Sequence, residues 1–450
     1  MTKDLTSGKP LRRILAFCGP LIVGNLFQQF YNLADSVIVG RLLGVGAFAA
    51  VGSTGSLNFL VLGFAIGICA GFTIPIAQSF GAQDREGVRR RTGQVVWLGV
   101  GFSLLLTGLT FFLTDDVLRL IRTPEEIFDD AYHYIFIVFM GTGAIVLYNL
   151  GAGILRALGD SRTPLLFLVA AVAVNIVLDV ALIAGLGLGV EGAAYATVFS
   201  QAASGLGCVA YILGKVPLLR LKGGDLKPHW RDMGTIASVG VPMGLQYSIT
   251  AVGSILLQSA VNSLGAGAVA AVTAGSRVHN VVGSPFDTFG MAMATYCGQN
   301  RGAGRVDRIR AGVRSMTAVA MLYCAAAFLL NAFFGKTIAQ LFIDAGEQEI
   351  LSNAHRYLVT ISAGYPLLVI VNVFRNSLQG MGYSNSAMFA GLAELLGRAL
   401  VAFGFVGRFG FPGVCFADPM AWIFADAILL PLYFVKIRAL EKRLGAAAPQ

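Results

Sequence analysis

Asp35 stands inside an apolar stretch near the beginning of the chain, where a charged side chain requires a physical reason. Gln28, Tyr31 and Asn32 precede it at helical spacing, so a helix over this stretch places the polar side chains on one side. Oxygen ligands of this kind suit a hard cation such as Na⁺. A carboxylate in a medium of low dielectric constant can instead carry a proton. The pattern therefore indicates a cation or proton site.

Asp179 is a second acid of the same kind, in a later apolar stretch. Asn175 precedes it by four residues, so the two side chains share a helix face. Asp35 and Asp179 both lie about five residues, or roughly 7 Å, before the expected outer end of their helices, and Thr197 lies at a comparable depth in the next helix. We predict that these residues form one coupling site. In the alternative interpretation, Asn and Thr hydrogen bonds only fix helix packing around each acid, and the choice between H⁺ and Na⁺ stays open.

The composition explains why a charged residue in these stretches is unusual. Of the 450 residues, 56% are hydrophobic and only 13% are charged, whereas soluble domains have about 25% charged residues. A soluble protein of this length could not bury so much apolar surface. This excludes a soluble enzyme, a disordered chain and a small secreted scaffold, and it indicates a chain that lies in lipid.

Twelve transmembrane helices fit the length, because a helix needs about 20 mainly apolar residues to cross a bilayer. We therefore predict an all-α polytopic membrane protein. The predicted spans are 14–40, 47–80, 89–114, 127–156, 163–184, 190–214, 233–262, 268–299, 309–332, 351–380, 386–408 and 412–438.

Lys and Arg are distributed unevenly across these spans. With the N-terminus inside, 24 of the 33 basic residues fall on the inner side and five on the outer side. Cytoplasmic loops of membrane proteins carry such an excess. We therefore predict an integral plasma-membrane protein, of a prokaryotic inner membrane, with both termini cytoplasmic. The same distribution accounts for the net charge of +9 without nucleic acid as a partner.

The two halves of the chain repeat each other at an offset of 221–223 residues. The segment 44–51 matches 265–272, and Pro20 matches Pro242. Both prolines fall within predicted spans, where the missing N–H favours a kink.

The repeat predicts the domain organisation. Six spans return the chain to the side on which it started, so the two halves have the same orientation. Parallel repeats related by an axis along the membrane normal are a transporter architecture. We predict six-helix lobes over 1–214 and 233–450, related by a pseudo-two-fold along the membrane normal and joined by a basic cytoplasmic linker over 215–232.

The acids of the predicted coupling site are not repeated in the second half. Asp179 corresponds to Ala402 and Asn175 to Arg398, so we expect the first half to couple ions. Glu394 lies four residues before Arg398, which predicts an internal ion pair. A role for this polar pair in substrate handling is the alternative.

Motifs of soluble enzymes and of ATP-driven pumps are absent from the sequence. The four histidines have no metal-like spacing, so no cofactor or metal is expected apart from Na⁺ held as a coupling ion by Asp35 and Asp179. A membrane-embedded enzyme would need clustered His residues or paired acids at a membrane face, and the chain has neither. Any pumping must therefore draw on an ion gradient or on an external subunit.

Longer motifs carry a resemblance to a known family. The segment Gln28–Gly44 reads QQFYNLADSVIVGRLLG, the segment Leu155–Asp160 reads LRALGD, and Gln78 and Gly81 lie at the end of the second predicted span. Together these motifs resemble the multidrug and toxic compound extrusion (MATE) transporters over essentially the whole chain. The resemblance implies two six-helix lobes around a V-shaped cavity and the export of drugs in exchange for H⁺ or Na⁺.

The polar residues of the first half are similar to those of one branch, the DNA-damage-inducible (DinF-like) transporters. That branch has Asp in helix 1, Asn in helix 4, Asn-x-x-x-Asp in helix 5 and Thr in helix 6. The corresponding residues are Asp35, Asn149, Asn175, Asp179 and Thr197. In that branch, bending of helix 1 at a proline is linked to protonation, and Pro20 would be that proline.

We therefore predict a secondary-active exporter of amphipathic compounds, expected to be cationic, that works by alternating access. Phe27, Gln28, Tyr31 and Asn32 are expected to line the substrate path. The partners are then small molecules, H⁺ or Na⁺ and membrane lipids, and the functional unit is expected to be a monomer. A lipid-linked precursor flippase of the same superfamily is the alternative, and assays of drug resistance and lipid flipping would separate the two.

Overall fold

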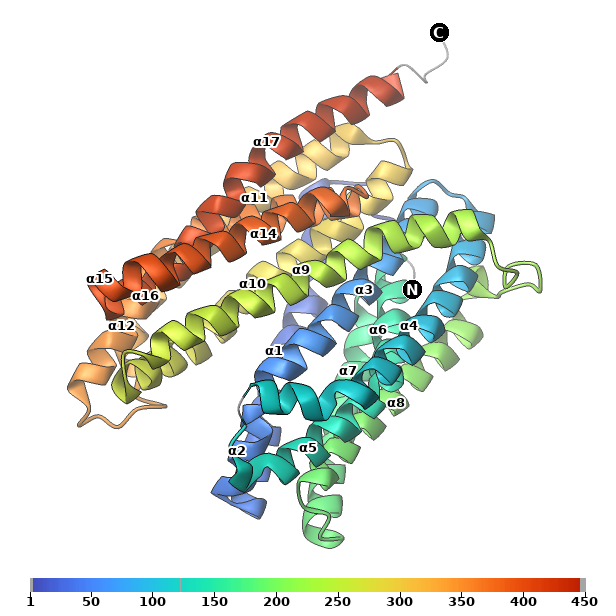
Figure 1. Ribbon diagram of the computed structural model, residues 1–450. Helices are drawn as coiled ribbons and strands as arrows, with labels where there is room; N and C mark the ends of the chain where they lie inside the picture. Colours follow the sequence, from blue (N-terminus) through green and yellow to red (C-terminus); the bar gives the residue numbers. More distant parts are fainter. Residues whose placement is uncertain (1–2, 122, 446–450) are drawn as a thin grey trace. The chain divides into compact units, whose positions relative to one another are not determined.

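The computed structural model describes residues 3–121 and 123–445, and its regular structure over these residues is helical throughout (Figure 1). The predicted all-α fold is thereby confirmed. Residues 1–2 and 446–450, for which a cytoplasmic location is predicted, lie outside the described residues.

The helices of the first half follow the predicted spans. They are α1 (Pro10–Leu43), α2 (Val45–Ser53), α3 (Gly55–Gly81), α4 (Arg85–Leu120), α5 (Glu125–Met140), α6 (Thr142–Ala157), α7 (Arg162–Val180) and α8 (Gly189–Lys215). A short π-helix, η1 (Ala181–Gly185), continues α7 directly. A 3₁₀ turn, η2 (Pro217–Leu219), begins the linker.

The second half repeats this order of elements. Its helices are α9 (Trp230–Asn262), α10 (Ala266–Gly302), α11 (Val306–Ala339), α12 (Gln348–Ala363), α13 (Tyr365–Gly380), α14 (Ser384–Leu400), α15 (Val406–Phe409), α16 (Phe411–Cys415) and α17 (Ala417–Gly445). A second π-helix, η3 (Val401–Phe405), continues α14 as η1 continues α7.

The predicted number of membrane spans is consistent with the helices of the described part of the chain. Nine of these helices are long and apolar enough to cross a membrane, and two bent pairs raise the number to eleven. The remaining long helix is α10, which has 37 residues and coincides with the predicted span 268–299. It is more polar than the others because it contains Arg277, His279 and Asp287.

Two of the predicted spans are bent by more than 40° where a continuous helix was expected. The pair α5 and α6 is bent by 46°, and the pair α12 and α13 by 48°. Gly141 at the first break packs so closely on Val198 that a Cβ atom there would overlap the valine side chain. Pro366, in the first turn of α13, has no N–H with which to continue the preceding helix.

The contacts divide the chain into two compact units. The first unit comprises Met1–Asp4 and Gly19–Gly244, and the second comprises Leu5–Cys18 and Leu245–Gln450. The division therefore falls inside α1 beside Pro20 and inside α9 beside Pro242. The predicted lobes were defined by the sequence repeat and separated at the linker, whereas these units are defined by contacts. The lobe boundaries therefore stay a prediction.

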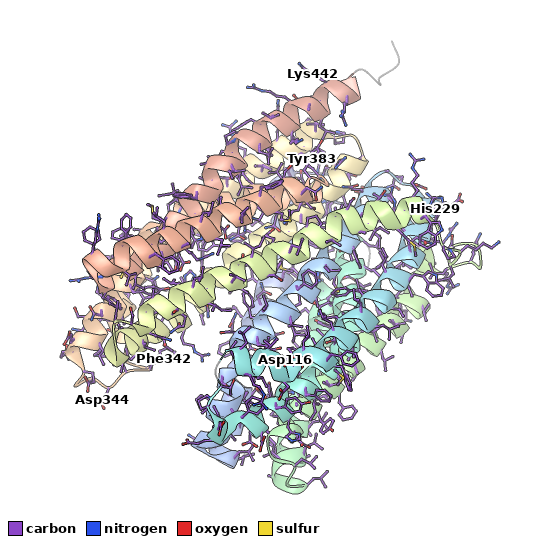
Figure 2. All side chains as sticks on the ribbon, in the orientation of Figure 1. Asp116, His229, Phe342, Asp344, Tyr383 and Lys442 are labelled. Carbon is purple, nitrogen blue, oxygen red and sulfur yellow. The ribbon has the colours of Figure 1, made fainter. Side chains whose placement is uncertain are left out.

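The basic linker is held by α4 in the first unit. Gln94 is fully buried, and its Nε2 donates to the carbonyl oxygens of Asp225 (3.1 Å) and Lys227 (3.0 Å). Its Oε1 accepts from the backbone N–H of His229 at 2.9 Å. Figure 2 shows His229 at this end of α4, with Asp116 toward the other end. The buried amide thus anchors the linker to α4, and Trp97 Nε1 adds a hydrogen bond to the carbonyl oxygen of Leu226 at 2.8 Å.

The segment before α1 is held in a similar way by the second unit. The backbone N–H of Leu5 donates to Gln299 Oε1 at 2.9 Å. The guanidinium of Arg308 donates to the carbonyl oxygens of Leu5, Ser7 and Gly8 at 3.1, 3.2 and 2.7 Å. Because Arg308 and Leu5 are both buried, the bonds to Leu5 satisfy backbone groups that water cannot reach, whereas Ser7 and Gly8 are exposed.

Candidate functional site

Asp179 is fully buried near the end of α7, one residue before that helix ends and η1 follows. With the Asn175 amide oriented to satisfy both of its polar atoms, Nδ2 donates to Asp179 Oδ2 at 2.9 Å. The Asn175 Oδ1 then accepts from the backbone N–H of Thr197 on α8 at 3.2 Å. The four-residue spacing of Asn175 and Asp179 thus places them in contact, and the amide connects α7 to α8.

Tyr31 brings α1 to the same place. Its Oη lies 3.2 Å from Thr197 Oγ1, across a sequence separation of 166 residues. Asp35 follows Tyr31 by one helical turn on α1, and its carboxylate interacts electrostatically with that of Asp179. The structure therefore gathers these side chains into one cluster, which we name the first-unit cluster: Asp35, Tyr31, Asn175, Asp179 and Thr197.

The first-unit cluster contains unused acceptor atoms. Among the described residues, neither Oδ1 of Asp35 nor Oδ1 of Asp179 has a hydrogen-bond partner. A buried carboxylate without partners is costly. Two carboxylates that share a site repel each other, and a proton or a cation between them would relieve both costs. The arrangement can therefore bind one positive charge.

Tyr134 joins this neighbourhood from α5, although sequence reasoning assigned it no role. Its buried side chain interacts electrostatically with Asp35, Tyr31 and Asp179. The signal that could have identified it is the repeated motif Ala131–Tyr134, which recurs as Ala354–Tyr357.

Asn149 is placed differently from the other predicted members. Its Nδ2 donates to the carbonyl oxygen of Ile145 at 2.9 Å, one turn back on the same helix, α6. Among the described hydrogen bonds, none joins Asn149 to the first-unit cluster. The structure does not bring this residue into the cluster, and its membership stays a prediction.

The residues predicted to line a substrate path lie on α1 before Asp35. Phe27 and Asn32 are exposed, and Gln28 is half-buried. Gln28 Nε2 lies 3.4 Å from Asn32 Oδ1, at the long end of hydrogen bonding. Together with Tyr31, these side chains offer apolar and polar groups on one helix, as a path for amphipathic compounds requires.

Pro20 lies in α1 fifteen positions before Asp35, and α1 continues across it from Pro10 to Leu43. The unit boundary after Cys18 falls two residues before this proline. Pro20 therefore marks the place where α1 passes from the second unit to the first, while its predicted role in bending stays a prediction.

The polar pair of the second half is part of a larger network. Glu394 forms a buried ion pair with Arg375 of α13, and its Oε2 lies 3.7 Å from Arg398 Nη1. Arg398 has a second acid, Asp418 of α17, whose Oδ1 lies 3.0 Å from its Nη2. Sequence spacing identified Glu394 and Arg398, but Asp418 is on another helix and no local pattern links it to them.

Oxygen atoms other than carboxylates would be needed to hold a metal ion in the first-unit cluster. Among the described residues, no group of three or more His, Cys, Asp or Glu side chains is arranged to bind a metal. Asp35 and Asp179 would hold Na⁺ with the hydroxyl and amide oxygens of Thr197 and Asn175, which are ligand types that suit hard cations.

A family model described as MatE matches this chain twice, over residues 20–181 and again over residues 242–403. The two matches are displaced by 222 residues, which agrees with the repeat in the sequence.

Relatives and solved structures agree with this match. The chain is 31% identical over 383 residues to the probable multidrug resistance protein YpnP of Bacillus subtilis (strain 168), with 84% of each chain covered. It is 28% identical over 215 residues to DNA damage-inducible protein F of Escherichia coli (strain K12), covering 47% of this chain and 46% of that protein. A crystal structure of a MATE protein in complex with MaL6 has a TM-score of 0.91 at 26% identity, covering 98% of this chain and 100% of that one.

Proposed function

The chain belongs to the MATE family of transporters, and on this premise we propose that it is a secondary-active exporter of amphipathic, cationic compounds. Export is driven by the inward movement of H⁺ or Na⁺. The single observation that supports this most strongly is the first-unit cluster, in which two acids have carboxylate oxygens without hydrogen-bond partners among the described residues.

The proposed coupling follows from the charge of that cluster. With no ion bound, Asp35 and Asp179 repel each other and attract a cationic substrate to α1. With H⁺ or Na⁺ bound, the repulsion is removed and so is the attraction for the substrate. A ligand shifts a conformational equilibrium only through its different affinity for the two states, so the ion and the substrate favour different states of the transporter.

The hydrogen bond between the hydroxyl groups of Tyr31 and Thr197 is the proposed link between ion occupancy and α1. Thr197 lies on α8 beside Asn175, which contacts Asp179, and Tyr31 lies one turn before Asp35. A change of charge at either acid therefore alters the groups that hold α1 against α8. Pro20, at the unit boundary of α1, is the proposed place where the helix responds by bending.

We also propose the orientation that the charge distribution predicts, with the linker and both termini in the cytoplasm. Within the second unit, Tyr383 and Lys442 lie at one end and Phe342 and Asp344 at the other (Figure 2). Tyr383 has cation–π contacts with Arg301 and Lys436, at 5.2 and 5.1 Å from its ring centroid, so basic side chains gather at the end assigned to the cytoplasm.

The test is transport by the full chain in proteoliposomes, with pH and Na⁺ gradients imposed separately and a fluorescent organic cation as the substrate. The proposal expects one of the two gradients to drive accumulation of the dye against its concentration gradient. If neither gradient drives transport, while labelled lipid-linked precursor crosses the same vesicles, the flippase alternative replaces the exporter.

A further inference from the structure

The second unit contains a group of buried ionisable side chains that the proposed function does not use. Arg375 on α13 pairs with Glu394 on α14, and Arg398 on α14 pairs with Asp418 on α17. In both ion pairs the two partners are largely removed from solvent. Each pair compensates the cost of burying its own charges, so the two positive and two negative charges of these four side chains cancel.

Asp426 is a further buried acid, and it belongs to neither of these ion pairs. It is only 5% exposed on α17, and among the described residues neither of its carboxylate oxygens has a hydrogen-bond partner. It lies eight residues after Asp418 on the same helix, which is roughly 12 Å along the axis. The charged group that acts on it electrostatically is Arg375, whose guanidinium is already bonded to Glu394.

The other acid near Arg375 is better accommodated. Asp287 on α10 interacts electrostatically with Arg375 and forms a hydrogen bond with Asn372. Its side chain is exposed although it lies well inside α10. Asp287 therefore has a hydrogen-bond partner, whereas an ionised Asp426 would be a buried charge with neither a hydrogen bond nor a cation of its own.

We propose that Asp426 is a proton-binding carboxylate, which gives the transporter a second proton site, in the second unit. The ligand is a proton because a hard metal cation needs several oxygen ligands, whereas the charged group that acts on Asp426 is a guanidinium. The inference deepens the proposed function, since it rests on the chain being driven by an ion gradient.

The proton on Asp426 controls the partner of Arg375. When the O–H bond of Asp426 breaks and the proton leaves to water, the new carboxylate attracts Arg375 away from Glu394. Glu394 still has Arg398, whose Nη1 lies 3.7 Å from its Oε2. Loss of one proton therefore changes the ion pairs that join α13, α14 and α17.

The remaining elements packed on α17 add no further charge at this position. The helix α11 meets α17 through the ion pair of Arg310 and Glu441, at the far end of α17. Neither α16 nor η3 contains an acid or a base apart from Cys415. Tyr247 on α9 also interacts with Arg375. The ionisable groups near Asp426 are therefore Tyr247, Asp287 and the members of the two ion pairs.

Infrared difference spectroscopy of the purified full chain, titrated with pH in H₂O and in ²H₂O, tests the proposal. A protonated carboxyl group in an apolar site has a C=O stretching band that shifts on deuteration. We expect the wild type and Asp35→Asn/Asp179→Asn to share one such band, and Asp426→Asn to lack it. A band that persists in Asp426→Asn would overturn the proposal.

A second variant keeps the test decisive if Asp426→Asn does not fold. Asp426→Glu retains a carboxyl group, so the band should remain but change in frequency, and an unchanged frequency would contradict the assignment. The measurement needs no substrate, so its outcome is distinct from that of the proposed function. If the wild type shows the band but no gradient-driven transport, the proposed exporter function is rejected. If it shows gradient-driven transport but no band, the proton site at Asp426 is rejected.

Discussion

At the scale of single residues, spacing along one helix was predictive and contact between helices was not. Asn175 and Asp179 meet because four residues separate them on α7. Tyr31 meets Thr197 across 166 residues, and no local pattern predicts such a contact. Tyr134 and Asp426 went unassigned for the same reason, because what distinguishes them is their surroundings in the folded chain.

Tyr31→Phe removes the hydroxyl that contacts Thr197 and leaves the aromatic ring in place. A hydrogen bond of this kind contributes about 1 kcal/mol, so we expect the affinity for the coupling ion to fall by about fivefold. The measurement is the concentration of H⁺ or Na⁺ that half-saturates transport in proteoliposomes. Tyr195→Phe, which removes an exposed hydroxyl on α8, is the control, and an equal effect in both variants would contradict the role of Tyr31.

Arg375→Met leaves Glu394 as a buried acid that has lost its ion-pair partner on α13. Removing one partner of a buried ion pair costs about 3–5 kcal/mol, so we expect a large fall in the thermal unfolding temperature of the purified protein. Adding Glu394→Gln to the same chain should restore much of the loss, since the buried carboxylate, whose remaining cation Arg398 lies 3.7 Å away, is then gone. A double variant less stable than Arg375→Met would show that the two side chains do not act as a pair.

At the scale of elements, the sequence predicted where helices occur but not where they bend or break. Hydrophobicity indicates where a span lies, but it does not reveal the bends at Gly141 and Gly364, which depend on backbone packing and on Pro366. The π-helices η1 and η3 had no sequence signal either. They follow α7 and α14 at similar places in the two halves, and such insertions often occur at functional sites.

Gly141 is required at the bend between α5 and α6 because Val198 of α8 lies against it. Gly141→Ala should therefore destabilise the protein by about 1–3 kcal/mol, the usual cost of overpacking. Gly143→Ala is the matched control, since a Cβ atom there meets no atom within 4 Å. The thermal unfolding temperatures of both variants check the prediction, and equal values would contradict it.

Asp160 caps the start of α7. Its Oδ1 accepts from the backbone N–H groups of Arg162 (3.0 Å) and Thr163 (3.1 Å), and its Oδ2 accepts from Thr163 Oγ1 at 2.7 Å. Burial raises the pKa of Asp160, but hydrogen bonds to the carboxylate, those from Thr163 among them, outweigh this effect, so the pKa lies below its ordinary value of 3.8. The ionised form thus stabilises the folded state.

The sign of this shift predicts a pH dependence. The contribution of Asp160 to stability is fully present above pH 3.8 and is lost as the pH falls through the lower pKa of the folded state. Asp160→Ala should cost about 1 kcal/mol at neutral pH, as for other helix caps, and the difference from the wild type should narrow in acid. A difference that stays constant with pH would contradict the role of the ionised cap.

At the scale of the whole molecule, the internal repeat was predictable because both halves retain enough of the same motifs. The family model matches each half separately. The division into units was harder to predict from the sequence, since it falls inside α1 and α9 at positions where the hydrophobic pattern continues without interruption. The two halves also differ in chemistry, with Asp35 and Asp179 in one and the Arg375 network in the other.

Cysteine labelling tests the orientation of the whole chain. All six native cysteines are buried, so they should give little background. Gly223→Cys in the linker should react with a membrane-impermeant maleimide only after the cells are opened, and Asp344→Cys should react in intact cells. The reverse pattern would place the linker outside and overturn the orientation that we propose.

The central claim is that the first-unit cluster binds the coupling ion, and gradient-driven export by Asp35→Asn and Asp179→Asn tests it most directly. Both substitutions remove a negative charge while keeping the size of the side chain. In proteoliposomes under the gradient that drives the wild type, we predict that each folded variant fails to accumulate substrate against its concentration gradient. Accumulation at the wild-type level by either variant would contradict the claim.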